Sequence, residues 1–112
     1  MKLILTWLAL TLPAIAIPQE RGIASWYGKE NKVSSAGKRL TNKTPGLAHK
    51  KLPLGTKVKI TDNKTKKSIV AVVEDRGPYI KGRIVDLNYL AAKQLGIIER
   101  GIANVTIQPL AN

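Results

Sequence analysis

Apolar residues along the chain fall into short runs that are separated by polar, glycine-containing turns. The β-branched runs Ser68–Val73 and Arg83–Leu87 are typical of buried strands, because each is short and mostly uncharged. Gly55–Thr61 and Ala103–Ile107 alternate polar and apolar positions, as half-buried strands do. Gly22–Gly28 predicts a further strand near the start. The pattern therefore favours a mainly β domain built from short strands.

Two short helices are predicted between these strands. Tyr89–Leu95 follows Asn88, a good N-cap residue, and ends at Gly96. Leu47–Leu52 is long enough for one or two helical turns, and Pro53 would stop it.

The two helical stretches belong to an internal echo. Residues 47–52 and 90–95 share the pattern Leu-Ala-x-Lys-x-Leu, and each is followed by a glycine and then by Val-x-Ile, at residues 58–60 and 105–107. Two interpretations stay open: two related units, or chance among common residues. Two interleaved units would form a closed six-stranded barrel with short helices, which leaves no exposed sheet edge.

The N-terminal segment is typical of export. Met1 and Lys2 give a positive start, Leu3–Leu12 is apolar but too short to span a bilayer, and residues 14–16 form an Ala-x-Ala site. We expect a signal peptide over residues 1–16 and one mature domain over residues 17–112, with an uncleaved anchor as the alternative. No cysteine follows the apolar run, so a lipid anchor is not expected.

Composition narrows the chemistry. The 112 residues contain no cysteine, which excludes disulfides and thiol chemistry, and a single histidine predicts no metal site and no cofactor. Nineteen Lys and Arg against seven Asp and Glu give a net charge of +12, which attracts polyanions. Export argues for anionic cell-wall polymers rather than nucleic acid as partners; the alternative is that the lysines only solvate the surface.

Few carboxylates are available for catalysis. Asp75 lies where a buried strand opens into Arg-Gly-Pro, so it either caps the turn or acts as a reacting group. Glu74 is adjacent and should point to the opposite face. Asp86 is a candidate for locking a loop, and Asp62 looks structural. A hydrolytic glycosidase needs two facing carboxylates, and a triad with His49 lacks a Gly-x-Ser-x-Gly elbow.

Several blocks resemble the rare lipoprotein A family. They are Ala24–Gly28, Ala36–Gly37, Ala48–Thr56, Asp75–Tyr79 and Gly82–Leu87, in the family's order and over nearly the whole mature chain. The resemblance implies a six-stranded double-psi β-barrel with short helices, similar to that of expansins and barwin-like proteins. It also implies an endolytic transglycosylase that cuts the MurNAc–GlcNAc bond of peptidoglycan without water and leaves a 1,6-anhydro end.

The resemblance also implies roles for individual residues. Asp75 matches the family's catalytic Asp and His49 its pocket His. Stacking on sugars and lining of the groove would fall to Trp26, Tyr27, Arg76 and Tyr79. The expected partners are peptidoglycan glycan strands and anionic cell-wall polymers. We expect a monomer without a stable membrane anchor, in the periplasm, the cell wall or the medium.

One position departs from the family pattern. Lys38, in the polar loop expected over residues 29–39, stands where the family has Glu. A Lys38 pointing into the pocket would lower the pKa of Asp75, and Glu30 is the nearest acid that would replace the missing one. Two hypotheses follow: an enzyme with Asp75 as acid and base supported by His49, or a non-catalytic glycan-binding module like the expansins. A secreted polyanion binder is a third class.

Overall fold

The computed structural model describes residues 18–27, 32–33, 39–40 and 43–111, with only the backbone of 32–33 and 39–40. The expected signal peptide, Glu30 and Lys38 lie outside the described residues. Among the described residues, no helix has the length and apolar character needed to cross a membrane.

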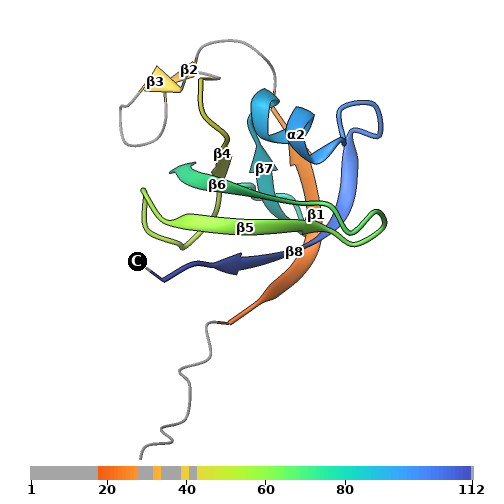
Figure 1. Ribbon diagram of the computed structural model, residues 1–112. Coiled ribbons are helices and arrows are strands. Elements are labelled where there is room, and N and C mark those ends of the chain that lie inside the picture. Colours follow the sequence, from red (N-terminus) through yellow and green to blue (C-terminus); the bar gives the residue numbers. More distant parts are fainter. Residues whose placement is uncertain (1–17, 28–31, 34–38, 41–42, 112) are drawn as a thin grey trace, which may run out of the picture.

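Six strands close into a barrel in the spatial order β1-β7-β4-β6-β5-β8 (Figure 1). A short ribbon of β2 and β3 and the helix α2 lie outside it. The bounds are β1 Glu20–Trp26, β2 Lys32–Val33, β3 Arg39–Leu40, β4 Gly46–Ala48, β5 Lys57–Asp62, β6 Ser68–Asp75, β7 Arg83–Leu87, α2 Tyr89–Leu95 and β8 Ile102–Pro109. The predicted closed barrel is confirmed, and part of the loop expected over residues 29–39 is strand.

The barrel has an internal two-fold pattern. β1 pairs with β7 in parallel and β4 pairs with β6 in parallel, whereas every other neighbouring pair is antiparallel. Exchanging β1 with β6, β4 with β7 and β5 with β8 therefore reproduces the same pairings. The topology agrees with the interpretation of two related units, residues 20–62 and 68–109.

The prediction of a helix over Leu47–Leu52, one of the two repeated stretches, is wrong. Leu47 and Ala48 lie in β4, which pairs with β6 and β7, and bends follow at residues 50–52. A six-residue stretch has little helical stability of its own, so pairing on both edges of β4 decides its conformation. The two repeated Val-x-Ile stretches are both strands, as predicted, and Ile60 of β5 pairs directly with Ile107 of β8.

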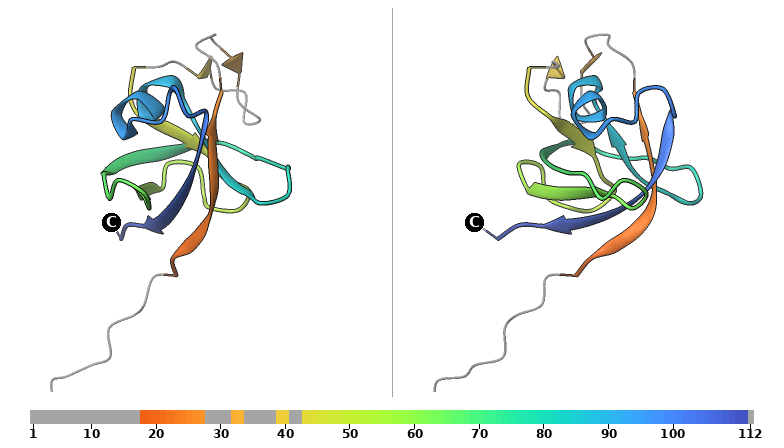
Figure 2. Two further views of the ribbon diagram at one scale, coloured as in Figure 1. Left: turned by 90° about the vertical axis from the view of Figure 1, so that its right-hand side faces the viewer. Right: turned by 45° about the vertical axis from the view of Figure 1, so that its right-hand side comes forward.

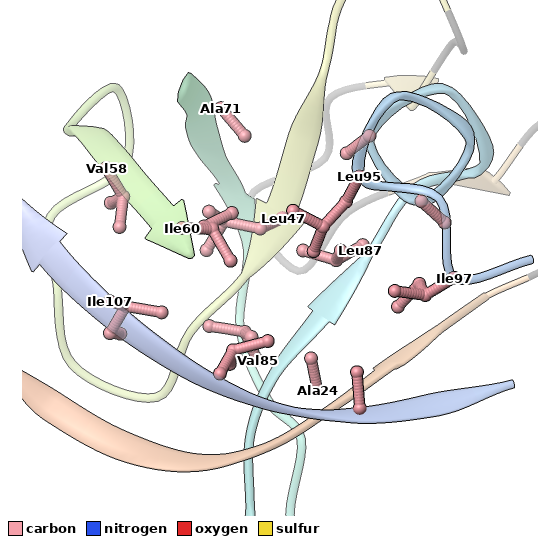
Figure 3. Close-up of a cluster of buried hydrophobic side chains, with 14 of the residues drawn as sticks. Ala24, Leu47, Val58, Ile60, Ala71, Val85, Leu87, Leu95, Ile97 and Ile107 are labelled. Carbon is pink, nitrogen blue, oxygen red and sulfur yellow. The ribbon is translucent and has the colours of Figure 1, made fainter. Parts of the chain in front are cut away.

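Apolar side chains of the barrel strands fill its interior (Figure 3). In β5, Val58 and Ile60 are fully buried while Lys57 and Lys59 are exposed, as the alternation predicted. The helix α2 closes the end of the barrel away from the start of β1 (Figure 1 and Figure 2) and adds the buried Leu95 to the core. Burying a side chain of this size contributes roughly 1.5–3 kcal/mol.

The predicted helix ends are confirmed. Asn88 accepts a hydrogen bond from the N–H of Ala91 at 2.9 Å, and its amide donates to the carbonyl of Thr44 at 2.8 Å. Gly96 has φ = 85° and donates its N–H to Ala92. A left-handed residue here favours glycine, since a side chain would be strained.

Asp62 has the structural role that the sequence indicated. The carboxylate is fully buried and accepts from the N–H of Lys64, the hydroxyl of Thr65 and the guanidinium of Arg100. Burial alone would raise its pKa, but these donors outweigh burial and hold the pKa below its ordinary value. Asp62 thus ties the β5–β6 turn to the segment before β8.

Candidate active site

Strand pairing brings two acids to one level of the sheet. Ser25 of β1 is opposite Asp86 of β7, Asp86 is opposite Ala48 of β4, and Ala48 is opposite Asp75 of β6. The hydroxyl of Ser25 donates to the carboxylate of Asp86. The sequence indicated Asp86 as a candidate for locking a loop, whereas this contact joins two side chains across neighbouring strands.

Tyr27 lies just beyond β1 and faces several carboxylates. Its N–H donates to the carbonyl of Leu87 at 2.9 Å, and its hydroxyl donates to Oε2 of Glu74 at 2.5 Å. Burial, followed by the hydrogen bond to Glu74 and the charges of Glu74, Asp75 and Asp86, raises the pKa of the phenol far above its ordinary value. The hydroxyl therefore stays protonated and acts as a donor.

Glu74 occupies an irregularity of the sheet. Leu47 pairs with Val73 and Ala48 with Asp75, so Glu74 is the extra residue on its strand. A bulge of this kind interrupts alternation and re-aims side chains. Glu74 accepts the Tyr27 hydroxyl, while Asp75 accepts the N–H of Arg76, so the two neighbouring carboxylates have different partners. That they point to opposite faces stays a prediction.

Asp75 has both a structural contact and a place in the site. Its Oδ1 accepts the N–H of Arg76 at 2.8 Å, which is the turn-capping contact expected of it. Its carbonyl accepts the N–H of His49 at 3.1 Å. Asp75 and His49 are thus neighbours through the backbone; that their side chains serve one site stays a prediction.

Both ring nitrogens of His49 are engaged. Nδ1 accepts the N–H groups of Lys51 and Leu52, each at 3.0 Å, so the proton lies on Nε2, which is 2.9 Å from Oε1 of Glu20. The residue is only 7% exposed. His49 therefore organises the turn after β4 and faces the start of β1.

Arg76 holds the same turn from the other side. Its Nη1 donates to the carbonyl of His49 at 3.1 Å and to that of Leu52 at 2.7 Å. Both bonds come from the same guanidinium nitrogen, whose two N–H groups serve one carbonyl each. This contact gives Arg76 a structural task, whereas the resemblance suggested that it lines the groove.

The predicted aromatic residues differ in exposure. Trp26 packs against the core, with its ring edge on Tyr89 at a centroid distance of 5.8 Å and an interplanar angle of 61°. Tyr79 is 75% exposed on the segment that follows Gly77 and Pro78. Of the three predicted stacking or groove aromatics, Tyr79 presents the most open ring, and Tyr27 is turned toward the carboxylates.

A basic hollow of about 370 Å³ lies beside His49. It is lined by Glu20, His49, Lys50, Lys51, Arg83 and Ile84. Its charge suits an anionic ligand group. No set of three or more acidic or histidine side chains suited to a metal ion is present in the described part of the chain.

Sequence reasoning missed Glu74 as a member of this site. The residue was visible beside Asp75, but its orientation depends on a bulge, and no local pattern marks one. Of the remaining predicted site residues, His49 is bonded to the backbone of Asp75, and Tyr27 is bonded to Glu74, the neighbour of Asp75. Lys38 lies outside the described residues.

The chain is similar in sequence to enzymes of cell-wall metabolism. The lytic transglycolase family model matches residues 19–107. The endolytic peptidoglycan transglycosylase RlpA of Vibrio cholerae is 44% identical over 91 residues, which cover 80% of this chain and 35% of that protein. RlpA of Rickettsia felis is 40% identical over 98 residues, 83% of this chain and 43% of that protein. The chain spans less than half of the length of the curated relatives it matches.

Solved structures share the fold. The Streptomyces papain inhibitor superposes with a TM-score of 0.69 at 18% identity, over 88% of this chain and all of that one. An expansin of Clavibacter michiganensis superposes with a TM-score of 0.63 at 18% identity, over 85% of this chain and 52% of that one. The fold is a double-psi β-barrel, as the resemblance implied.

Proposed function

The chain belongs to the lytic transglycolase family, and we propose that it is an endolytic peptidoglycan transglycosylase. Its substrate would be the glycan strands, cut between MurNAc and GlcNAc with a 1,6-anhydro end as product. The family match over residues 19–107 carries this proposal. The backbone bond between His49 and Asp75 supports it, as does the electrostatic effect of Asp75 on the Tyr27 hydroxyl.

Asp75 is the acid and base of the reaction in this proposal. Protonated Asp75 gives its proton to the bridging oxygen as the bond from the muramyl anomeric carbon to that oxygen breaks. The 6-hydroxyl of the same muramyl residue then forms a bond to the anomeric carbon and returns its proton to Asp75. No water is consumed. The N–H of Arg76, 2.8 Å from Oδ1, fixes the orientation of the carboxylate.

His49 acts as a positioning residue for Asp75. Its ring accepts two N–H groups of its own turn, and the turn is bonded to the backbone of Asp75 and to the guanidinium of Arg76. Tyr79, exposed beyond the Gly-Pro turn, is suited to stacking on a sugar face. The basic hollow beside His49 would receive an anionic group of the wall.

The proposed location follows from the sequence and the substrate. Residues 1–16 would direct export, and the mature domain over residues 17–112 would act in the periplasm or the cell wall as a monomer. Exposed lysines on β5 and the β5–β6 turn (Lys57, Lys59, Lys64, Lys66 and Lys67) would favour contact with anionic cell-wall polymers.

A second candidate is a glycan-binding module without catalysis. Lys38 in place of the family's Glu favours it, and the fold is shared with expansins, one of which was solved in complex with cellohexaose. The two candidates predict the same binding and different products.

The test is incubation of the purified protein with peptidoglycan strands stripped of stem peptides, with products analysed by mass spectrometry. Release of 1,6-anhydro-muramyl ends that Asp75→Asn abolishes supports the enzyme. Binding without such products supports the module. Lys38→Glu restores the family's acid, and an increased rate would show that Lys38 weakens the site.

A further inference from the structure

We propose that Glu74 is the second carboxylate of the active site and contacts the sugar at the anomeric centre. The inference rests on the proposed function. The family pattern expects an acid where this chain has Lys38, and Glu74 of β6 supplies an acid in its place. Tyr27 and Gly46 are its positioning residues.

Tyr27 fixes the Glu74 carboxylate from one side. The Tyr27 backbone is bonded to Leu87 of β7 at 2.9 Å, and its hydroxyl reaches Oε2 at 2.5 Å. Because the phenol is held protonated by its surroundings, it donates to the carboxylate throughout the physiological range. A donor aimed at a carboxylate stabilises the anionic form.

Gly46 makes the room that the carboxylate occupies. A methyl group added at Gly46 would lie 2.7 Å from Oε2 and closer still to Oε1. Gly46 is buried in β4 and is not among the glycines with positive φ in the described chain, so its backbone does not require glycine. Glycine at position 46 is therefore explained by the Glu74 carboxylate, which occupies the space that a side chain on β4 would take.

The bulge places this carboxylate beside Asp75. Glu74 and Asp75 are consecutive on β6 and both are partly exposed; Glu74 accepts the Tyr27 hydroxyl, and the charge of Asp75 contributes to the raised pKa of that hydroxyl. A substrate that reaches Asp75 therefore meets Glu74 in the same part of the site. A lone carboxylate cannot both donate a proton and, at the same moment, carry the charge that an oxocarbenium-like centre needs.

The two acids divide these tasks. Asp75 transfers its proton to the leaving oxygen as the glycosidic bond breaks. The Glu74 carboxylate, held by the Tyr27 hydroxyl, stabilises the positive charge that develops at the anomeric carbon. The 6-hydroxyl oxygen then bonds to that carbon and its proton passes to Asp75. Glu74 forms no bond and gains no proton, so the reaction balances without a co-reactant.

The main test is Glu74→Gln. The amide keeps the shape and an oxygen for the Tyr27 hydroxyl but removes the charge. We expect kcat for anhydro-product release to fall about 10²-fold, with KM changed by less than about threefold. Glu99→Gln removes the same charge at an exposed position between α2 and β8 and is expected to leave kcat unchanged. Thermal unfolding of each variant reports on folding.

Two further variants test the positioning. Tyr27→Phe removes the donor, and Gly46→Ala displaces the carboxylate while keeping every ionisable group. Each is expected to lower kcat about tenfold and to alter the pH profile of kcat, which loss of packing alone would not do. Full activity of Gly46→Ala would overturn the positioning by Gly46.

The outcomes separate the two proposals. If Glu74→Gln keeps kcat within about threefold of the wild type, the role of Glu74 is wrong while that of Asp75 stands. If the wild type releases no anhydro ends, both proposals are overturned. If Asp75→Asn and Glu74→Gln each reduce kcat and leave glycan binding intact, both are supported.

Discussion

Replacing His49 tests how the turn after β4 serves Asp75. In His49→Ala the N–H groups of Lys51 and Leu52 lose their acceptor, and the bond to Glu20 is lost as well. His49→Asn is the informative partner, because an Asn side-chain oxygen can accept N–H groups two and three residues ahead. Comparing the two variants therefore distinguishes a His49 that only holds the turn from a His49 whose ring takes part in the chemistry.

The magnitude follows from these contacts. Each lost backbone bond costs about 1 kcal/mol, and a buried donor left without an acceptor costs up to about 3 kcal/mol. Lys51 is exposed and can turn to water, whereas Leu52 is half-buried, so we expect about 2–4 kcal/mol for His49→Ala. A domain of this size loses about 4–8 °C of Tm for each kcal/mol. His49→Asn should lose about 5 °C.

Thermal unfolding by circular dichroism and turnover of stripped glycan strands are the assays. We expect His49→Asn to retain most of the turnover, with a larger effect on kcat than on KM, and His49→Ala to lose turnover and stability together. A normal Tm for His49→Ala would contradict the structural reasoning. Loss of turnover by about 10²-fold in a stable His49→Asn would show that the ring itself acts on the substrate.

Three further substitutions test the contacts that stabilise the fold around the site. Asp62→Asn should lower the free energy of unfolding by about 2 kcal/mol at neutral pH. Hydrogen bonds hold the folded pKa of Asp62 below its ordinary value of 3.8, so this difference is present above pH 3.8 and disappears as the pH falls through the lower folded pKa. A difference that persists in denaturant titrations at about pH 2 would refute this reasoning. Asn88→Ala should cost about 1–2 kcal/mol and reduce helical signal, since it loses the cap and the bond to Thr44; an unchanged Tm would be inconsistent. Trp26→Ala should cost about 2 kcal/mol, because the partly buried ring packs on Tyr89 and the core. Trp26→Phe should keep glycan affinity, and a selective loss of affinity would favour stacking on sugars instead.

Local sequence signals were sufficient where a segment's neighbours in the chain decide its structure. The helix begins after Asn88 and ends at Gly96 because both caps act on residues within one turn. The alternation in β5 identified its buried face, because side chains on a strand repeat every two residues. The structural role of Asp62 was readable from its turn, although its contact with Arg100 was not.

The residues of the site depended on more than local sequence. The position of Asp75 at the end of a buried strand indicated it as a candidate, and the resemblance gave roles to Asp75, His49 and Tyr27. The ring of His49 was not placed by that reasoning, since its contact with Glu20 joins segments 29 residues apart. Leu47 and Ala48, which were expected in a helix, lie in β4 because this segment pairs with β6 on one edge and with β7 on the other.

The sequence by itself determined a β-rich chain with short strands, one capped helix and an acid at the Gly-Pro turn. These features depend on the spacing of apolar residues, on strand propensity and on helix-capping residues, all of which are local. Only the tertiary structure decided that β1, β4, β6 and β7 meet at one level, that Glu74 interrupts its strand, and that Tyr27 and the space over Gly46 fix its carboxylate. The reason is physical: a bulge and a parallel register arise from the pairing of strands distant in the chain, and no residue pattern within one strand specifies them.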